Sequence, residues 1–270
     1  MDNSKIALIS TVINQELYKK SSQLFPNDIP KYVIDGSNGM FGIDSICYMM
    51  KKLKGKGIEW LIMADEDVLF VNPDGVFSLI EEMNSKNYFV CGVRDGGVIP
   101  NRYFNPYLIN TFFSIINFKE LELIWNEQEV LKNQYINENE FTVDLNELKM
   151  AYDVKSIYEP YYCFYFWLRR NNKKILFLEA TAPFSADRIT TLVYDTAGAA
   201  LLYHTWYARS YGNNDKHTDR INRVFNLLQF KNNKTINPIV FRDKGFFLTQ
   251  KIKKLGRKFK MKIQKIGIGI

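Results

Sequence analysis

The sequence predicts one α/β domain whose central sheet is mostly parallel and flanked by helices. The chain has 270 residues, of which 46% are hydrophobic and 24% are charged, so one core can form without disulfides or a structural metal. Short apolar runs alternate with helical patterns over the first ninety or so residues. Because parallel neighbours need a crossover connection, this alternation indicates a parallel sheet. We assign residues 1–235 to this domain and residues 236–270 to a basic tail.

The first part of the chain supplies four predicted strands and two predicted helices, in the order β-β-α-β-α-β. The strands are short apolar runs rich in β-branched residues, at Lys5–Val12, Lys31–Gly36, Ile58–Ala64 and Asn87–Val93. Apolar residues at helical spacing predict helices at Ile43–Lys54 and from Asp74 onward.

The second half is less regular. A loop rich in Gly, Pro and Asn runs from Arg94 to Pro106, and loops of this kind often surround functional sites. Apolar runs predict strands at residues 111–117, 175–180 and 199–208, and the aromatic stretch before Ile175 has a helical pattern. A polar stretch at residues 231–238 is the nearest approach to a linker.

Two acidic residues directly follow the third predicted strand. Asp65 and Asp67 are one residue apart, so in an extended chain their side chains share one face while Glu66 points to the other. Ligands of α/β proteins bind at the carboxyl ends of parallel strands, and carboxylate oxygens suit Mn²⁺ or Mg²⁺. The pattern predicts a site for such a cation, which would stabilise the charge of a diphosphate leaving group. An acidic turn that only closes a buried strand is the alternative.

The segment around these acids, IEWLIMADEDVLFVNPDG, resembles the GT-A glycosyltransferases. In that family an apolar strand carries Asp-x-Asp, and a short strand with a proline turn follows. The matching pieces here are the strand LIMA, Asp65, Asp67, the run Val68–Val71, and Asn72-Pro73. The resemblance implies a Rossmann-like GT-A fold. It also implies transfer of a sugar from a nucleoside diphosphate, with a UDP-sugar favoured, to a glycan or lipid-linked acceptor in bacterial surface polysaccharide or lipopolysaccharide synthesis.

The resemblance also implies roles for individual residues. Asp35, at the end of the second predicted strand, matches an early acid that contacts the nucleotide, and Asp65 would face the donor as well as the metal. His204 matches a further metal or diphosphate ligand at the end of a late strand. A turn or capping role for Asp35 and a packing role for His204 remain alternatives.

A carboxylate must remove the acceptor hydroxyl proton if the transfer inverts the anomeric centre, and a partly buried acid with a raised pKa suits that task. Glu159 is our leading candidate, because the acid, helix and strand around it resemble those of inverting members; Asp95 and Asp187 are reserves. An ion pair between Glu159 and a nearby arginine is the alternative. Arg94 and Arg102 are candidate phosphate partners. The balance between inversion and retention leans slightly to inversion.

The net charge of +7 comes from the tail. Eight Lys and Arg and no acid lie between Lys251 and Lys265, so the rest of the chain sums to about −1, which argues against a nucleic-acid partner for the domain. Apolar residues recur every three or four positions from Leu248 to Ile266, which predicts a basic amphipathic helix that binds an anionic membrane surface. A solvated tail, or a helix docked on the domain, is the alternative.

The cysteines and the N-terminal sequence indicate the compartment. Cys47, Cys91 and Cys163 are far apart in apolar surroundings and are expected to be free thiols. The N-terminal residues have the pattern of a first strand, not of a signal peptide or a membrane span. We therefore expect a cytoplasmic protein that associates peripherally with the inner face of the cell membrane.

Two other functions remain open at this point. A nucleotidyltransferase acting on sugar phosphates also places metal-binding carboxylates on an α/β sheet, but it usually has an early Gly-rich phosphate loop that this chain lacks after residues 5–12. A non-catalytic module that binds glycans or membranes could keep the same fold, since fold alone does not determine function.

Overall fold

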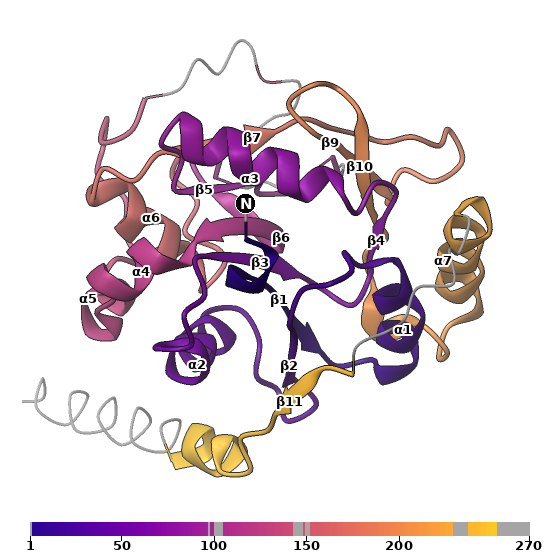
Figure 1. Ribbon diagram of the computed structural model, residues 1–270, viewed down its shortest axis with the longest axis horizontal. Coiled ribbons are helices and arrows are strands. Elements are labelled where there is room, and N and C mark those ends of the chain that lie inside the picture. Colours follow the sequence, from indigo (N-terminus) through magenta and orange to yellow (C-terminus); the bar gives the residue numbers. More distant parts are fainter. Residues whose placement is uncertain are drawn as a thin grey trace, which may run out of the picture.

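The fold was obtained as a computed structural model, which describes residues 2–96, 98–99, 105–142, 148, 152–228 and 237–252 (Figure 1). Two β-sheets and seven α-helices make up this part of the chain. Among the described residues, every helix is too short or too polar to span a bilayer.

The larger sheet has seven strands and is mostly parallel. In spatial order its strands are β11 (Ile239–Phe241), β2 (Lys31–Asp35), β1 (Ile6–Val12), β3 (Trp60–Ala64), β6 (Ile109–Asn117), β5 (Val90–Arg94) and β7 (Ile175–Leu178). Only β6 runs against its neighbours; the other four pairings are parallel. The carboxyl ends of β1, β2 and β3 therefore lie at the same edge of the sheet.

A second, antiparallel sheet lies next to that edge. Its four strands, in spatial order, are β4 (Val68–Phe70), β10 (Ala200–His204), β9 (Thr191–Tyr194) and β8 (Ala180–Thr181). The chain passes from β3 of the large sheet to β4 of the small sheet through residues 65–67. The acidic motif is thus located where the two sheets meet.

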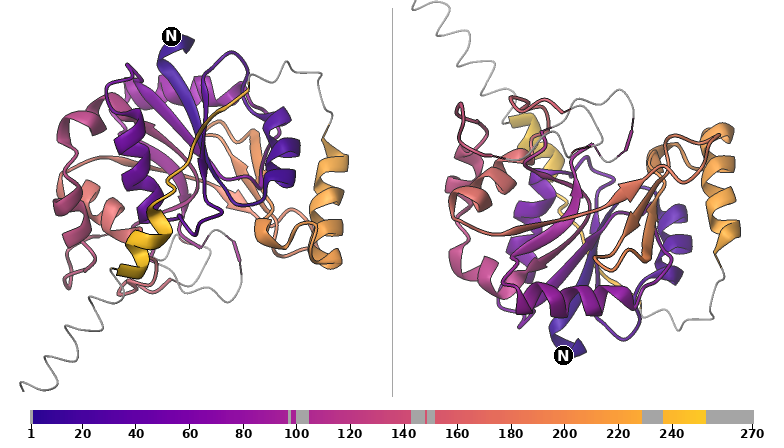
Figure 2. Two further views of the ribbon diagram at one scale, coloured as in Figure 1. Left: turned by 90° about the horizontal axis from the view of Figure 1, so that it is seen from below. Right: turned by 90° about the horizontal axis from the view of Figure 1, so that it is seen from above.

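Helices cover both faces of the large sheet (Figures 1 and 2). One layer contains α1 (Gln15–Ser21), α3 (Gly75–Ser85) and α7 (Asp215–Leu227), together with the small sheet. The other contains α2 (Ile43–Leu53), α4 (Phe118–Ile124), α5 (Glu127–Lys132) and α6 (Tyr162–Arg170). Short 3₁₀ turns lie at η1 (Asn3–Lys5), η2 (Ser22–Leu24) and η4 (Ala208–Ser210).

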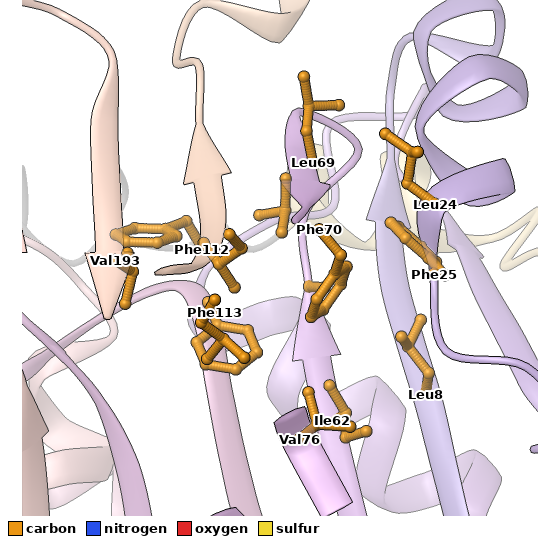
Figure 3. Close-up of a cluster of buried hydrophobic side chains, with 14 of the residues drawn as sticks. Leu8, Leu24, Phe25, Ile62, Leu69, Phe70, Val76, Phe112, Phe113 and Val193 are labelled. Atoms are coloured by element: carbon orange, nitrogen blue, oxygen red, sulfur yellow. The ribbon is translucent and has the colours of Figure 1, made fainter. Parts of the chain in front are cut away.

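Strand β1 illustrates why the sheet needs two helical layers. Ile6 and Leu8 belong to the buried cluster that includes residues of α1 and α3. Ala7 and Ile9 belong to the cluster that includes residues of α2 and α6, because successive side chains in a strand point to opposite faces. Both faces are apolar, as in other parallel sheets. Figure 3 shows part of the core between the large sheet and the layer that contains α1 and α3. In this core Phe25, Phe70 and Phe113 form a chain of edge-to-face ring contacts.

The predicted fold class is confirmed: the protein is α/β, with a mostly parallel central sheet between helices. The four strands predicted in the first part correspond to β1, β2, β3 and β5, and the two helices to α2 and α3. The prediction missed helices α1, α4, α5 and α7 and strands β9 and β11. All four of these helices begin after an asparagine whose side chain accepts a hydrogen bond from a first-turn amide, namely Asn14, Asn117, Asn126 and Asn214.

The segment assigned to the tail contributes to the sheet. Strand β11 pairs in parallel with β2, and the ring of Phe241 stacks on Tyr32 at 5.6 Å. The predicted boundary at residue 235 thus leaves one strand of the central sheet on the tail side. Residues 246–252 are also helical, and residues 253–266 of the predicted amphipathic helix lie outside the described residues, as do residues 231–236 of the predicted linker.

Candidate active site

A cavity of about 970 Å³ opens at the carboxyl ends of β1 and β3. Its walls come from several parts of the chain. They are the ends of these strands, residues 41–46 at the start of α2, Ile99, residues 110–112 of β6, residues 159–161 before α6, and His204 at the end of β10 with the loop that follows it. Cavities of this size hold small-molecule ligands, and this edge of a parallel sheet is where α/β proteins bind them.

Asp65 and Asp67 both line the cavity. The backbone fixes them from two sides. The amide of Asp65 donates to the carbonyl of Phe112 on β6 at 2.9 Å, and the carbonyl of Asp67 accepts from the amide of Thr205, after β10, at 3.0 Å. The two sheets therefore hold the predicted pair of carboxylates in one cavity.

Glu66 has a different environment from its two neighbours. One of its carboxylate oxygens accepts hydrogen bonds from the amides of Ile13 and Asn14, at 3.0 and 3.1 Å, where β1 ends. Burial and the charge of Asp67 raise the pKa of Glu66 to about 7, although the two amides act in the opposite direction. Glu66 thus ties the acidic segment to β1.

His204 lies beside Asp67. Its Nε2 is 3.2 Å from Oδ1 of Asp67, and both side chains are almost fully buried. The pairing of β10 with β4 places His204 opposite Val68, and the imidazole stacks on Phe112 with ring centroids 3.9 Å apart. The Nδ1 atom of His204 is buried, and none of the described residues forms a hydrogen bond with it. Asp67 and His204, which the sequence predicted as metal ligands together with Asp65, are thus adjacent in the folded protein.

The donor set fits a divalent cation that a bound ligand helps to coordinate. Burial and the charges of Glu66 and Asp67 raise the pKa of Asp65 well above its usual range, which means that negative charge is crowded here. A cation would offset that repulsion. Among the described residues, no three His, Cys, Asp or Glu side chains form a complete metal-binding group. Mg²⁺-like ions commonly bind one or two carboxylates and take their remaining ligands from substrate phosphates and water.

Arg209 also lines the cavity and was not among the predicted residues. Its charge acts on Asp65, lowering the pKa of that carboxyl against the larger effects of burial and of Glu66 and Asp67. The guanidinium lies 4.9 Å from the centre of the ring of Phe41, which lines the wall at the start of α2. The sequence HTWYARSYG carries the signal, since a cation follows a predicted strand end among aromatic residues.

Glu159 lines the wall formed by the start of α6. Its backbone carbonyl accepts from the amide of Tyr162 at 3.1 Å and from Nε2 of Gln134 at 3.0 Å, so the residue has a fixed position. The alternative for Glu159 was an ion pair with Arg169 or Arg170. Arg170 instead forms a salt bridge with Glu140 at 2.6 Å.

Asp95 is fully buried and does not line the cavity. Its carboxylate accepts from the hydroxyl of Tyr161 at 2.5 Å, from the hydroxyl of Tyr162, and from Nδ2 of Asn110 at 3.0 Å. The prediction of Asp95 as a reserve base does not fit this position. The residue instead links β5 and β6 to the start of α6, and so supports the wall that carries Glu159.

Asp187, the other reserve base, also lies outside the cavity lining. Its carboxylate accepts from the amides of Ile189 and Thr190 and from the hydroxyl of Thr190, and it lies 3.6 Å from Nη1 of Arg220. Although burial acts to raise it, the pKa of Asp187 is lowered by these hydrogen bonds and by Arg220. The structure therefore gives Asp187 a supporting position.

Two further predicted residues lie away from the cavity lining. Asp35 accepts from the amide of Ser37 at 3.1 Å and forms a salt bridge with Arg242 at 3.0 Å. Arg94 donates to the carbonyl of Pro106, and its guanidinium stacks 3.7 Å from the centre of the Phe177 ring. Burial lowers the pKa of Arg94. Arg102 lies outside the described residues.

Comparisons with known proteins add the following findings. No protein-family model and no curated protein matches the chain. Among solved structures, a glycosyltransferase involved in glycosylation of the major capsid of PBCV-1 is 18% identical, covers 46% of this chain and has a TM-score of 0.32. This chain spans 64% of that protein. Mouse xyloside xylosyltransferase 1 is 8% identical over 65% of this chain and 85% of its own, with a TM-score of 0.37. TarS of S. aureus is 14% identical over 46% of this chain and 51% of its own, with a TM-score of 0.26. We therefore argue function from the cavity itself.

Proposed function

We propose that the protein is a metal-dependent glycosyltransferase that moves a sugar from a nucleoside diphosphate, with UDP favoured, to a glycan or lipid-linked acceptor. The observation that carries this proposal is the convergence of Asp65, Asp67, His204, Arg209 and Glu159 on one cavity at the carboxyl edge of the parallel strands. Such a cavity combines acidic metal ligands, a cation for phosphate and a carboxylate for proton transfer, which are the groups that this reaction needs.

The carboxylates of Asp65 and Asp67 would hold Mn²⁺ or Mg²⁺, which supplies Lewis-acid neutralisation of the charge that develops on the leaving diphosphate. His204 holds Asp67 in place through its Nε2 and is the nearest candidate for a third ligand. The unpartnered Nδ1 of His204 lies on a buried imidazole that lines the cavity, so a ligand could satisfy it.

Arg209 and the start of α2 would bind the diphosphate oxygens. Arg209 is the cationic member of the described cavity lining, and a planar guanidinium suits phosphate. Helix α2 begins at the wall, where its first-turn amides have no partner within the helix. These groups would favour an anion beside the start of α2, against the charge of Asp44 in the first turn of that helix.

Glu159 is our candidate for the general base. It lies on the wall next to Pro160 and Tyr161 and would accept the proton of the acceptor hydroxyl as the glycosidic bond forms. A base in this role implies inversion at the anomeric carbon, because the acceptor attacks from the face opposite the leaving diphosphate.

We also propose that the protein associates peripherally with the inner face of a membrane. The helical residues 246–252 expose Phe247, Leu248 and Ile252, and the basic segment Lys251–Lys265 begins at their end. Gln250, in the same helical residues, donates to Asp44 at the cavity wall at 3.2 Å, so the exposed apolar side chains lie close to the cavity. Such a position suits an acceptor that is itself attached to the membrane, as in surface polysaccharide or lipopolysaccharide synthesis.

The test is an activity assay on the purified full-length chain with a panel of nucleotide sugars, with Mn²⁺ and with EDTA. We expect release of a nucleoside diphosphate from one sugar nucleotide, only with the metal. Asp67→Asn should abolish this release, and Glu159→Gln should lower kcat for transfer while leaving donor binding intact. Asp74→Asn, which changes an exposed acid outside the cavity, is the matched control.

Two outcomes would contradict the proposal, and a third would contradict only the role of Glu159. Turnover of a nucleoside triphosphate with a sugar phosphate would instead identify a nucleotidyltransferase. Binding of glycans or vesicles without binding of any nucleotide would identify a non-catalytic module. Product with retained anomeric configuration would leave the transferase standing but remove Glu159 from its role.

A further inference from the structure

We propose that Tyr207 forms a stacking platform for the ring of an uncharged saccharide acceptor. The proposal rests on the function proposed above and assigns one end of the cavity to the acceptor. Tyr207 lines the cavity, and 52% of the residue is exposed, although it lies in an ordered loop between β10 and α7. One face of the ring stacks on His217 of α7, with centroids 4.3 Å apart and planes 18° apart. Sugar rings bind aromatic faces by burying their apolar C–H groups against them.

The backbone at this point has a costly conformation. Trp206 and Tyr207 both have positive φ angles, of 58° and 62°, in the left-handed region that bulky residues rarely adopt. Such conformations cost of order 1 kcal/mol or more each and persist where surrounding contacts impose them, often at functional sites. A half-exposed tyrosine gains little stability from burial in exchange, so this cost suggests that the ring serves a ligand.

The surrounding contacts hold this loop firmly. Arg220 of α7 donates to the carbonyl of Trp206 at 3.0 Å, and the indole of Trp206 donates to the hydroxyl of Thr191 at 3.1 Å. Nδ2 of Asn14, at the start of α1, donates to the carbonyls of Ala208 and Tyr211 at 2.9 and 2.8 Å. Tyr207 is therefore presented on a frame fixed at both ends, which lowers the entropy lost when a ligand binds.

The position of Tyr207 relative to Arg209 separates it from the nucleoside. Arg209 reaches across to Phe41, on the wall that starts α2, next to the proposed diphosphate groups. The Tyr207 ring instead stacks on α7, outside the large sheet. Phe41 is itself 52% exposed and is the better placed ring for a nucleobase. Tyr207 is therefore assigned to the acceptor.

The charges of the cavity indicate an uncharged acceptor. Among the described lining residues, one cation, Arg209, stands against five carboxylates, namely Asp44, Asp65, Glu66, Asp67 and Glu159. The proposed metal neutralises two of them, and the donor diphosphate brings further negative charge. A phosphate or carboxylate on the acceptor ring at Tyr207 would meet like charges at short range. A saccharide with free hydroxyls avoids this repulsion and can donate to Glu159.

The test compares acceptor binding and donor binding in Tyr207→Ala, Tyr207→Phe and Tyr135→Ala, the last a control that changes an exposed ring outside the cavity lining. The probes are neutral methyl glycosides and oligosaccharides, and the same compounds carrying a phosphate or a carboxylate. We expect Tyr207→Ala to raise the acceptor KM about tenfold, as loss of one stacked ring does, with the Kd of the donor nucleotide unchanged. Tyr207→Phe should restore the acceptor KM, and neutral probes should exceed the charged ones in kcat/KM.

Two results of the kinetic comparison would overturn the platform. One is a raised donor Kd in Tyr207→Ala with an unchanged acceptor KM, since the ring would then serve the nucleobase. The other is a preference for the phosphorylated or carboxylated probes. Ligand-observed NMR of the same probes measures acceptor binding without turnover. If the native protein releases no nucleoside diphosphate but binds neutral glycosides through Tyr207, the proposed enzyme function fails and the platform stands; if no neutral glycoside binds, the platform fails.

Discussion

Replacing Arg220 with methionine should strongly destabilise the protein, because this arginine connects three segments from a buried position. Its Nη1 atom donates to the hydroxyl of Thr190 at 2.9 Å and lies 3.6 Å from Asp187, and its Nη2 atom donates to the carbonyl of Trp206 at 3.0 Å. Burial lowers the pKa of Arg220, and Asp187 acts against that shift. Methionine fills similar space but satisfies none of these partners.

The magnitude follows from what the variant leaves behind. Removing one partner of a buried ion pair costs about 3–5 kcal/mol, because the other charge stays buried without compensation. The side chains of Arg220 and Asp187 are only 7% and 14% exposed, so solvent can compensate little. Since domains are stable by about 5–15 kcal/mol, the loss should move the urea midpoint of the variant far below that of the native protein.

Urea unfolding followed by circular dichroism measures the effect. Arg223→Met changes an exposed arginine on the same helix and should leave the midpoint nearly unchanged. Adding Asp187→Asn to Arg220→Met removes the uncompensated charge and should recover part of the lost stability. A loss below about 1 kcal/mol for Arg220→Met, or strictly additive effects in the double variant, would refute the role given to this ion pair.

Two further predictions concern stability. Gly92→Ala should destabilise by about 1–3 kcal/mol, because its Cβ would lie 2.7 Å from the carbonyl oxygen of Phe113 on β6; a native-like urea midpoint would show that the strands can separate without cost. Hydrogen bonds from Arg170 lower the pKa of Glu140, so the stabilisation is fully present above the unfolded pKa and is lost as pH falls through the folded pKa. Glu140→Gln should therefore lower stability at pH 7 and flatten the acid side of a stability–pH curve, and an unchanged acid side would count against the pair.

Much of the fold was predictable because the strands of the large sheet are continuous apolar runs with local signals at their ends. The four strands predicted before Arg94 all appear in the sheet. The missed helices are short or polar, so their periodicity is weak, yet each begins at an asparagine cap. Strand β9 has only four residues and depends on pairing with β10 and β8.

The candidate site was likewise predictable in part. Asp65 and Asp67 were predictable because their position at a strand end is local, and their proximity to His204 follows from one strand pairing. The position of Asp95 was not predictable, because its partners Tyr161 and Tyr162 are 66 and 67 residues away in the sequence. The direction of Tyr207 and Arg209 depends on a left-handed turn held by tertiary contacts, which no local pattern reveals.

The most direct test of the central claim is isothermal titration calorimetry of UDP, with and without Mn²⁺, on the native protein and on Asp67→Asn. Other nucleoside diphosphates are titrated in parallel, and Asp74→Asn is the control. We expect one nucleoside diphosphate to bind the native protein and the control only when Mn²⁺ is present, and to bind Asp67→Asn at least about tenfold more weakly, as loss of a charged metal ligand implies. Binding that is equally tight without the metal, or that Asp67→Asn leaves unchanged, would contradict the assignment of Asp65 and Asp67 to a metal–diphosphate site.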